Sequence, residues 1–259
     1  MRCQNGNVAL AIHSIRLLVS LTVFAICAFV QTLQAEGVKL SLSAALSPPQ
    51  TTADQTGYID LIAKEAFERA NVGLAYQSTT VRRGMFGTAT GEFDGFIAAP
   101  IMPAPQLKPL VRVLEPIFAS IAGGVFLRDG IEINTLSDFS KYRVGYPKAC
   151  KRAAMLLRDV PDKYAAHSPA LLMEMLAQNR IDVAFTFFSQ ARHIATERKI
   201  TGLKFSKYMN YSRLYIHLNP KHAEIAPELA RAIRSMKVDG TYFKILGRAN
   251  TGTKQDVSE

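Results

Sequence analysis

Residues 91–97 read Gly-Glu-Phe-Asp-Gly-Phe-Ile, and residues 179–185 read Asn-Arg-Ile-Asp-Val-Ala-Phe. In each stretch a residue that commonly ends helices is followed by a charged residue, an apolar residue, an Asp and a run typical of a buried strand. The two Asp residues lie 88 positions apart. Because both stretches fall where a helix pattern gives way to a strand pattern, they predict two related α/β lobes.

Strand and helix patterns alternate on either side of both stretches. Alternating or continuous apolar runs predict strands at 38–44, 74–76, 93–99, 117–127, 142–146, 181–187 and 214–218. Apolar residues at helical spacing predict helices at 58–71, 81–90, 151–158, 169–178, 189–199 and 227–238, with a short helical turn at 136–139. The Pro-rich segment 100–109 predicts a loop. The chain therefore reads as an α/β protein.

The first 35 residues differ in composition from the rest. They carry Arg2 and Arg16 but no acidic residue, and an apolar run follows at 17–30. This run is short for a membrane span and has the length of a signal-peptide core. We predict cleavage after Ala35 and export to the periplasm; the alternative is an uncleaved signal anchor.

Charge and cysteine content narrow the functional classes. Without residues 1–35 the chain has 29 Lys and Arg against 21 Asp and Glu, a net charge of +8. This balance favours anionic partners, although solubility alone is an alternative explanation. The basic residues are scattered and match no nucleic-acid-binding motif, so we expect no nucleic-acid partner. Cys150 is the single cysteine after residue 35, which excludes an intramolecular disulfide.

Four short motifs occur in an order and spacing that resembles the solute-binding proteins of family 3. This is the type II periplasmic group that includes the amino-acid-binding components of ABC transporters. The stretch 57–61 resembles the family's helix start, and 91–95 resembles its Gly-x-x-Asp segment. The stretch 136–145 resembles its Leu-x-Asp-Leu-x-Gly-x-x-Val-Gly segment, and 238–246 resembles its closing Asp-Gly-Thr-Tyr-x-x-Ile.

The resemblance implies a two-lobed type II periplasmic-binding-protein fold, in which two Rossmann-like α/β lobes are joined by two hinge strands. Lobe 1 would comprise 36–121 plus 213–259, and lobe 2 would comprise 122–212. The hinge would lie near Gly123-Gly124 and 208–212. A small-molecule ligand would bind in the interlobe cleft at strand ends, and the lobes would close around it by a hinge motion.

The sequence departs from the family at both charged positions that hold an amino acid. The resemblance places an Arg for the ligand carboxylate where this chain has Gln106, and an Asp for the ligand ammonium where it has Phe187. An α-amino acid would leave its charges poorly paired in a closed cleft, which is costly at low dielectric. We therefore predict that the ligand is a small polar or anionic metabolite and not a standard α-amino acid.

Other residues are candidates to replace the missing charged groups. Arg83, at the start of a predicted helix of lobe 1, is either a cleft residue or a structural cation. Lys148, Lys151 and Arg152 surround the start of a helix in lobe 2, and either bind an acidic group or are solvated surface cations. Tyr58 and Phe187 either line the cleft or belong to the core. The predicted ligand-binding residues are Tyr58, Arg83, Ala99, Ile101, Gln106, Lys148, Cys150, Lys151 and Phe187.

These features favour a monomeric binding protein that delivers a solute to an ABC permease or a membrane sensor and does no chemistry on it. One alternative is a lyase that resembles the cyclohexadienyl dehydratases, but this chemistry needs a cationic clamp and a positioned acid. A second alternative is an interaction protein without a ligand. We expect no cofactor and no metal, because the His residues after position 35 lack metal-ligand spacing.

Overall fold

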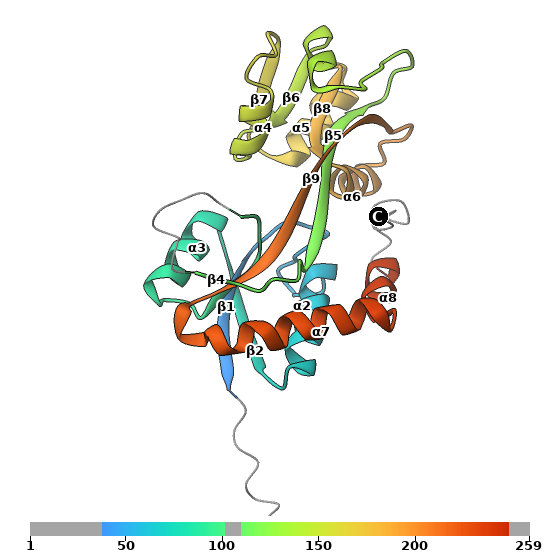
Figure 1. Ribbon diagram of the computed structural model, residues 1–259. Coiled ribbons are helices and arrows are strands. Elements are labelled where there is room, and N and C mark those ends of the chain that lie inside the picture. The colour runs from blue at the N-terminus through green and yellow to red at the C-terminus, as the bar shows by residue number, and fades with distance from the viewer. Residues whose placement is uncertain (1–37, 102–109, 249–259) are drawn as a thin grey trace, which may run out of the picture. The chain divides into compact units, whose positions relative to one another are not determined.

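The computed structural model describes residues 38–101 and 110–248 of the chain (Figure 1). The predicted signal peptide and Gln106 lie outside the described residues. Among the residues described, no helix has the length and apolar character needed to cross a membrane.

The first half of the fold is built around three parallel strands in the order β2-β1-β3. Its elements are β1 (Lys39–Ala45), α2 (Tyr58–Arg69), β2 (Gly73–Thr79), α3 (Val81–Thr90) and β3 (Gly95–Ala99). The α3 helix begins at Thr80, whose hydroxyl accepts a hydrogen bond from the Arg83 backbone N–H at 3.2 Å. It ends at Gly91, which has a φ of 87°. This is the left-handed conformation, which glycine adopts without strain.

The second half repeats this arrangement with parallel strands in the order β7-β6-β8. Its elements are the 3-10 helix η2 (Leu136–Lys141), β6 (Val144–Pro147), α4 (Lys151–Leu156), β7 (Lys163–Ala166), α5 (Pro169–Ala177), β8 (Val183–Phe187) and α6 (Phe188–Arg198). The α5 helix begins at Ser168, whose side chain caps the Leu171 backbone N–H, and Pro169 occupies its first turn.

Two antiparallel strands connect the halves into one nine-stranded sheet (Figure 1). The strands are β5 (Phe118–Phe126) and β9 (Lys204–Leu218). β9 pairs with β3 and with the short β4 (Val111–Arg112) near its end, and with β5 along most of its length. β5 in turn pairs with β8 of the second half. The chain then returns to the first half through η3 (Pro220–Ile225), α7 (Ala226–Val238) and α8 (Thr241–Arg248).

The two Asp stretches are equivalent in the structure. The Asp94 backbone donates to the Ser41 carbonyl at 2.8 Å, and the Ser41 N–H donates back to the Asp94 carboxylate at 2.8 Å. Asp182 makes the same two bonds with Arg143, at 2.9 and 3.0 Å. Each Asp thus joins the strand it precedes to the start of the neighbouring parallel strand. The prediction of two related α/β lobes is confirmed.

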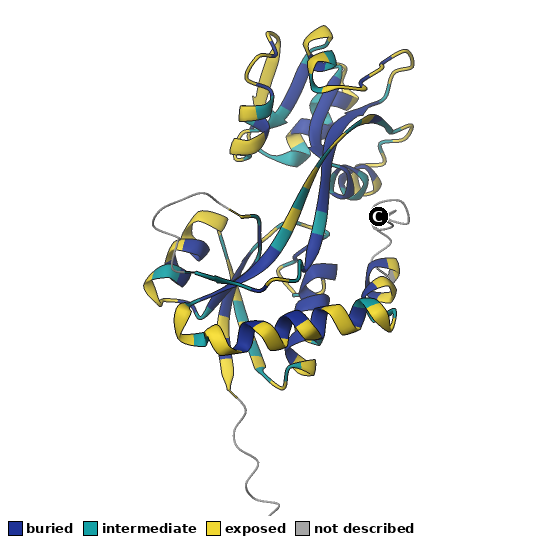
Figure 2. Ribbon diagram, viewed as in Figure 1, coloured by how far each residue is buried: buried dark blue, intermediate teal, exposed yellow. Residues whose placement is uncertain are grey.

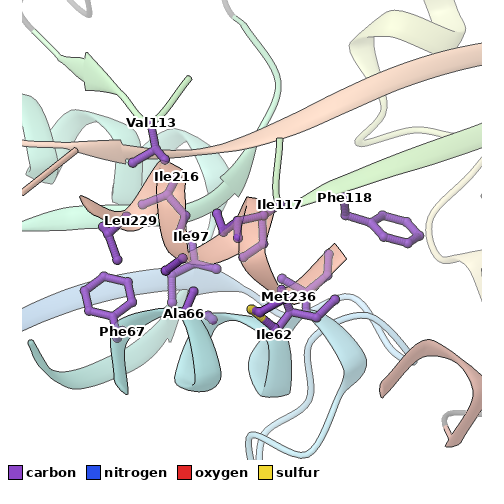
Figure 3. Close-up of a cluster of buried hydrophobic side chains, with 14 of the residues drawn as sticks. Ile62, Ala66, Phe67, Ile97, Val113, Ile117, Phe118, Ile216, Leu229 and Met236 are labelled. Carbon is purple, nitrogen blue, oxygen red and sulfur yellow. The ribbon is translucent and has the colours of Figure 1, made fainter. Parts of the chain in front are cut away.

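The hydrophobic core follows this division. One cluster of buried side chains comes only from positions 40–118 and 216–246. Figure 3 shows part of it, with Ile62 and Phe67 of α2 facing Leu229 and Met236 of α7. Two further clusters lie in the second half: one contains Leu172 and Ile194, the other Phe139 and Leu157. Figure 2 shows the same alternation of buried and exposed positions along α7 that the predicted apolar stripe requires.

Several strands differ from the sequence prediction. β9 begins at Lys204, ten residues before the predicted strand at 214. Its residues 207–213 alternate between exposed and half-buried, so they lack the apolar signal that marks a buried strand. β7 was not predicted because three of its four residues are exposed, and β4 has only two residues.

Candidate ligand-binding site

The predicted ligand-binding residues that the structure describes lie at two sheet edges. The carboxyl ends of parallel strands meet at one edge of a sheet, which is where α/β proteins bind ligands. In the first half, Tyr58 lies in the helix that follows β1, and Arg83 lies in the helix that follows β2. Ala99 is the last residue of β3, and Ile101 comes two residues later. In the second half, Lys148, Cys150 and Lys151 follow β6, and Phe187 ends β8.

Tyr58 belongs to the core of the first half. Its side chain is 0 % exposed and its ring lies 4.9 Å from that of Phe118. The start of α2 is fixed by the buried Asp60, whose carboxylate accepts the backbone N–H groups of Thr52 and Gly57 at 2.9 and 3.0 Å. The aromatic ring at this position therefore supports the fold, as the core interpretation of Tyr58 expects.

The end of β3 combines a buried and an exposed residue. Ala99 is buried, and its carbonyl oxygen lies 3.3 Å from Nε2 of His217 on β9. Ala98 has a φ of 64°, and the pairing with β9 shifts register there. Burial lowers the pKa of His217, and the positive charge of Arg112 lowers it further. The hydrogen bond with the Ala99 carbonyl acts in the opposite direction but does not outweigh burial. Ile101 is 59 % exposed, so it presents an apolar side chain at this edge.

Arg83 lies on the surface of α3. Its side chain is 71 % exposed and forms an ion pair with Glu92 at 3.4 Å. An exposed pair of this kind contributes little to stability. Arg83 is thus accessible to a ligand, in competition with Glu92.

Three adjacent cations lie at the start of α4. Lys148, Lys151 and Arg152 are exposed, and within the described part of the chain none of them forms an ion pair with a carboxylate. Cys150 is half-buried, is a free thiol, and precedes the first residue of the helix. α4 has only six residues, so any attraction of an anion to this segment depends on the cationic side chains.

Phe187 is the residue predicted to stand where the resembling family holds a ligand ammonium. It ends β8, pairs with Ala122 of β5 and is half-buried against the cluster that contains Phe139 and Val183. No acidic residue replaces it nearby in the chain: the segments 79–91, 97–110, 146–158 and 183–196 contain no Asp or Glu. The segments that follow β2, β3, β6 and β8 therefore carry cations and apolar groups but no carboxylate.

One contact between the two halves was not predicted from the sequence. Gln50, in the loop between β1 and α2, donates from Nε2 to Oγ of Ser189 in the first turn of α6, at 3.4 Å. Both residues are buried, with exposures of 6 % and 8 %. No pattern in the sequence signals this contact, because it joins residues 139 positions apart.

A surface hollow of ≈ 430 Å³ lies at the far end of α6 from Phe187, lined by Arg192, Lys199 and Leu203 among others. It contains none of the predicted ligand-binding residues. Ligands of α/β proteins bind at the carboxyl ends of parallel strands, whereas the residues that line this hollow lie at the C-terminal half of α6 and just beyond it. We therefore do not assign the ligand to it.

No protein-family model matches the chain, and no curated protein sequence matches it either. Solved structures do match. A histidine kinase sensor domain with similarity to periplasmic binding proteins has a TM-score of 0.67 at 15 % identity, covering 83 % of this chain and 97 % of its own. An ancestral arginine-binding protein bound to arginine has a TM-score of 0.63 at 18 % identity, covering 81 % and 97 %.

The L-cystine solute receptor of Neisseria gonorrhoeae, in its unliganded open conformation, has a TM-score of 0.64 at 17 % identity, covering 81 % of this chain and 92 % of its own. The matches cover nearly the whole length of each of these structures. The strand order and the repeated Asp contacts of the present chain also fit a fold built from two similar α/β halves. The chain therefore has the two-lobed α/β fold of the periplasmic amino-acid-binding proteins.

Proposed function

We propose that the protein is a periplasmic solute-binding protein that captures a small anion without an ammonium group, for a transporter or a membrane sensor. Its lobes are 36–121 plus 213–259 and 122–212, and residues 1–35 direct export and are removed. The separate core clusters of the two halves support this division. The binding proteins and the sensor domain among its structural neighbours support a role in binding rather than catalysis.

The observation that carries the proposal is the absence of a carboxylate where an ammonium would need one. Phe187 ends β8, and the segments that follow β2, β3, β6 and β8 contain no Asp or Glu, while the loop after β1 contains the exposed Asp54. A zwitterion held there would bury its ammonium without a counter-charge, which costs several kcal/mol. An anion, in contrast, meets Lys148, Lys151 and Arg83, of which the two lysines have no ion-pair partner among the described residues.

Titration calorimetry with the standard α-amino acids tests the proposal. We expect no sub-micromolar binding of any of them to the wild-type protein; such binding would overturn the proposal. The double variant Phe187→Asp with Gln106→Arg restores both charged positions of the resembling family. We expect it to gain affinity for at least one amino acid. Phe243→Asp, which places the same new charge on the exposed face of α8, is the matched control and should gain none.

A further inference from the structure

One face of β9 carries an exposed apolar pair between two cations. Lys207, Met209, Tyr211 and Arg213 alternate with half-buried residues and all four are exposed. Met209 is 43 % exposed and Tyr211 is 56 % exposed. The Tyr211 hydroxyl donates to the Met209 sulfur at 3.6 Å, so the two side chains lie against each other. This pair forms a small apolar surface on the strand that connects the halves.

The α4 helix adds a cation and another apolar group beside this pair. A guanidinium nitrogen of Arg152 lies 3.5 Å from the Tyr211 carbonyl oxygen, a weak hydrogen bond that places the two residues together. Met155 follows three residues later and is 60 % exposed. Residues three apart share one face of a helix, so Met155 and Arg152 point to the same side of α4.

The described part of the chain does not cover this surface. Residues 209–214 of β9 pair with β5, whereas pairing with β3 begins at Tyr215 and pairing with β4 at His217. No ion pair between Arg152 and a carboxylate occurs among the described residues. The segments that supply these side chains, 146–158 and 204–222, contain no Asp or Glu. A surface that combines cations with exposed apolar side chains and has no carboxylate is complementary to an anion with an apolar body.

We infer that Arg152, Met155, Met209 and Tyr211 bind an amphipathic carboxylate, with an aromatic or branched aliphatic body and no ammonium group. This rests on the proposed function and names the class of its solute. The Arg152 guanidinium pairs with the carboxylate in the planar geometry that suits both groups. The polarisable methionine side chains and the Tyr211 ring contact the apolar body.

A matched series of small molecules tests the inference by calorimetry on the protein without residues 1–35. The series is 3-phenylpropanoate, its alcohol 3-phenylpropan-1-ol, its amino acid phenylalanine, and propanoate. We expect 3-phenylpropanoate to bind at least about tenfold more tightly than each of the others, which corresponds to the loss of one charge-assisted bond or one apolar contact surface. Equal binding of propanoate, or tighter binding of phenylalanine, would overturn the inference.

Two variants locate the site. Arg152→Gln should remove the preference for the acid over the alcohol, and Tyr211→Ser should weaken 3-phenylpropanoate about tenfold while leaving propanoate unchanged. The matched controls are Arg180→Gln, an exposed arginine in the turn between α5 and β8, and Tyr164→Ser, an exposed tyrosine of β7; both should bind as the wild type does. Circular dichroism checks that all four variants fold.

The outcomes separate the inference from the proposed function. If the protein binds propanoate and 3-phenylpropanoate equally, anion binding stands and the apolar part of the site is wrong. If Arg180→Gln loses the preference as fully as Arg152→Gln does, the site lies elsewhere and the inference fails. If no member of the series binds, the inference is wrong, and the proposed function then depends on which solute purifies with the protein.

Discussion

Asp94 and Asp182 occupy equivalent positions in the two halves but are held by different partners. Each carboxylate accepts a backbone N–H from the neighbouring strand. In the first half the remaining contacts come from Lys221 at 2.7 Å and His222 at 2.8 Å, both supplied by η3. In the second half they come from Arg143 at 2.8 Å, and from Arg128, so that no histidine takes part.

The difference shows which part of the repeat the fold requires. The backbone contacts of the Asp are the same in both halves, because they join a parallel strand to its neighbour wherever that unit occurs. The cations differ in type and in origin: η3 is distant in sequence from Asp94, whereas Arg143 is the backbone partner itself. A carboxylate is therefore the constant element of the unit, and any nearby cation can pair with it.

The largest expected effect comes from removing each carboxylate. Asp182→Ala removes a carboxylate that is only 11 % exposed and that accepts the Arg143 backbone N–H and pairs with two partly exposed arginines, and it should lower the free energy of unfolding by about 3 kcal/mol. Asp94→Ala should cost about 2 kcal/mol, because its side-chain partners are one lysine and a histidine ring nitrogen and it is more exposed than Asp182. Urea unfolding measures both.

The exposed pair of Arg158 with Asp159 supplies the control for this comparison. Asp159→Ala should change the free energy of unfolding by less than about 0.5 kcal/mol. If Asp94→Ala and Asp182→Ala had equally small effects, the carboxylate would not be the constant structural element of the repeat.

The dependence of stability on pH tests the same comparison of Asp94 with Asp182. Partial burial opposes ionisation of Asp94, but hydrogen bonds from Lys221, Ser41 and His222 outweigh it and lower the pKa to about 2. Because this folded pKa lies below the unfolded value, the stabilisation is present above about pH 4 and is lost as the pH falls toward 2. It amounts to roughly 2 kcal/mol. The pKa of Asp182 is likewise lowered, chiefly by Arg143.

Unfolding measured from pH 5 to pH 2 checks this linkage. Asp94→Asn should flatten the acid limb of the stability curve by removing the contribution of one carboxylate. An acid limb as steep as that of the wild type would contradict the assigned role of Asp94.

Substitution of one glycine in each half tests how tightly the surrounding side chains are packed. A Cβ on Gly84 of α3 would collide with the Phe96 ring and approach Ser43, whereas a Cβ on Gly145 of β6 would meet the ends of Leu172 and Ile181. An aromatic ring moves less readily than an aliphatic tip, so we expect Gly84→Ala to cost about 1.5 kcal/mol and Gly145→Ala below about 1 kcal/mol. The reverse order in thermal unfolding would show that the second half is packed more rigidly.

A small effect is also expected at the contact between the halves. Gln50→Ala removes the 3.4 Å bond to Ser189, and a long bond of this kind should contribute less than about 1 kcal/mol to stability. If the halves move relative to each other on binding, the variant should change ligand affinity more than stability. Parallel calorimetry and thermal unfolding measure the two, and a loss of stability above about 2 kcal/mol would contradict this assignment.

The sequence predicted most of the helices and the repeat, because these depend on local signals, but it did not predict η3 or α8. The predicted range 81–90, with Gly91 as the stop, matches the bounds of α3, whereas its N-cap Thr80 was identified only in the structure. β9 was predicted only from Leu214, because residues 207–213 show no regular alternation of polar and apolar side chains and none of them is buried. Phe187 was identified through the resemblance to family 3, whereas Arg152, Met155, Met209 and Tyr211 come together only in the folded chain.

Native mass spectrometry of the protein released from the periplasm tests the central claim most directly. We predict a bound small molecule that carries a carboxylate and no ammonium group, and that is lost together with its stabilisation on unfolding and refolding. A bound α-amino acid, or a protein that carries no solute and is stabilised by none, would contradict the account.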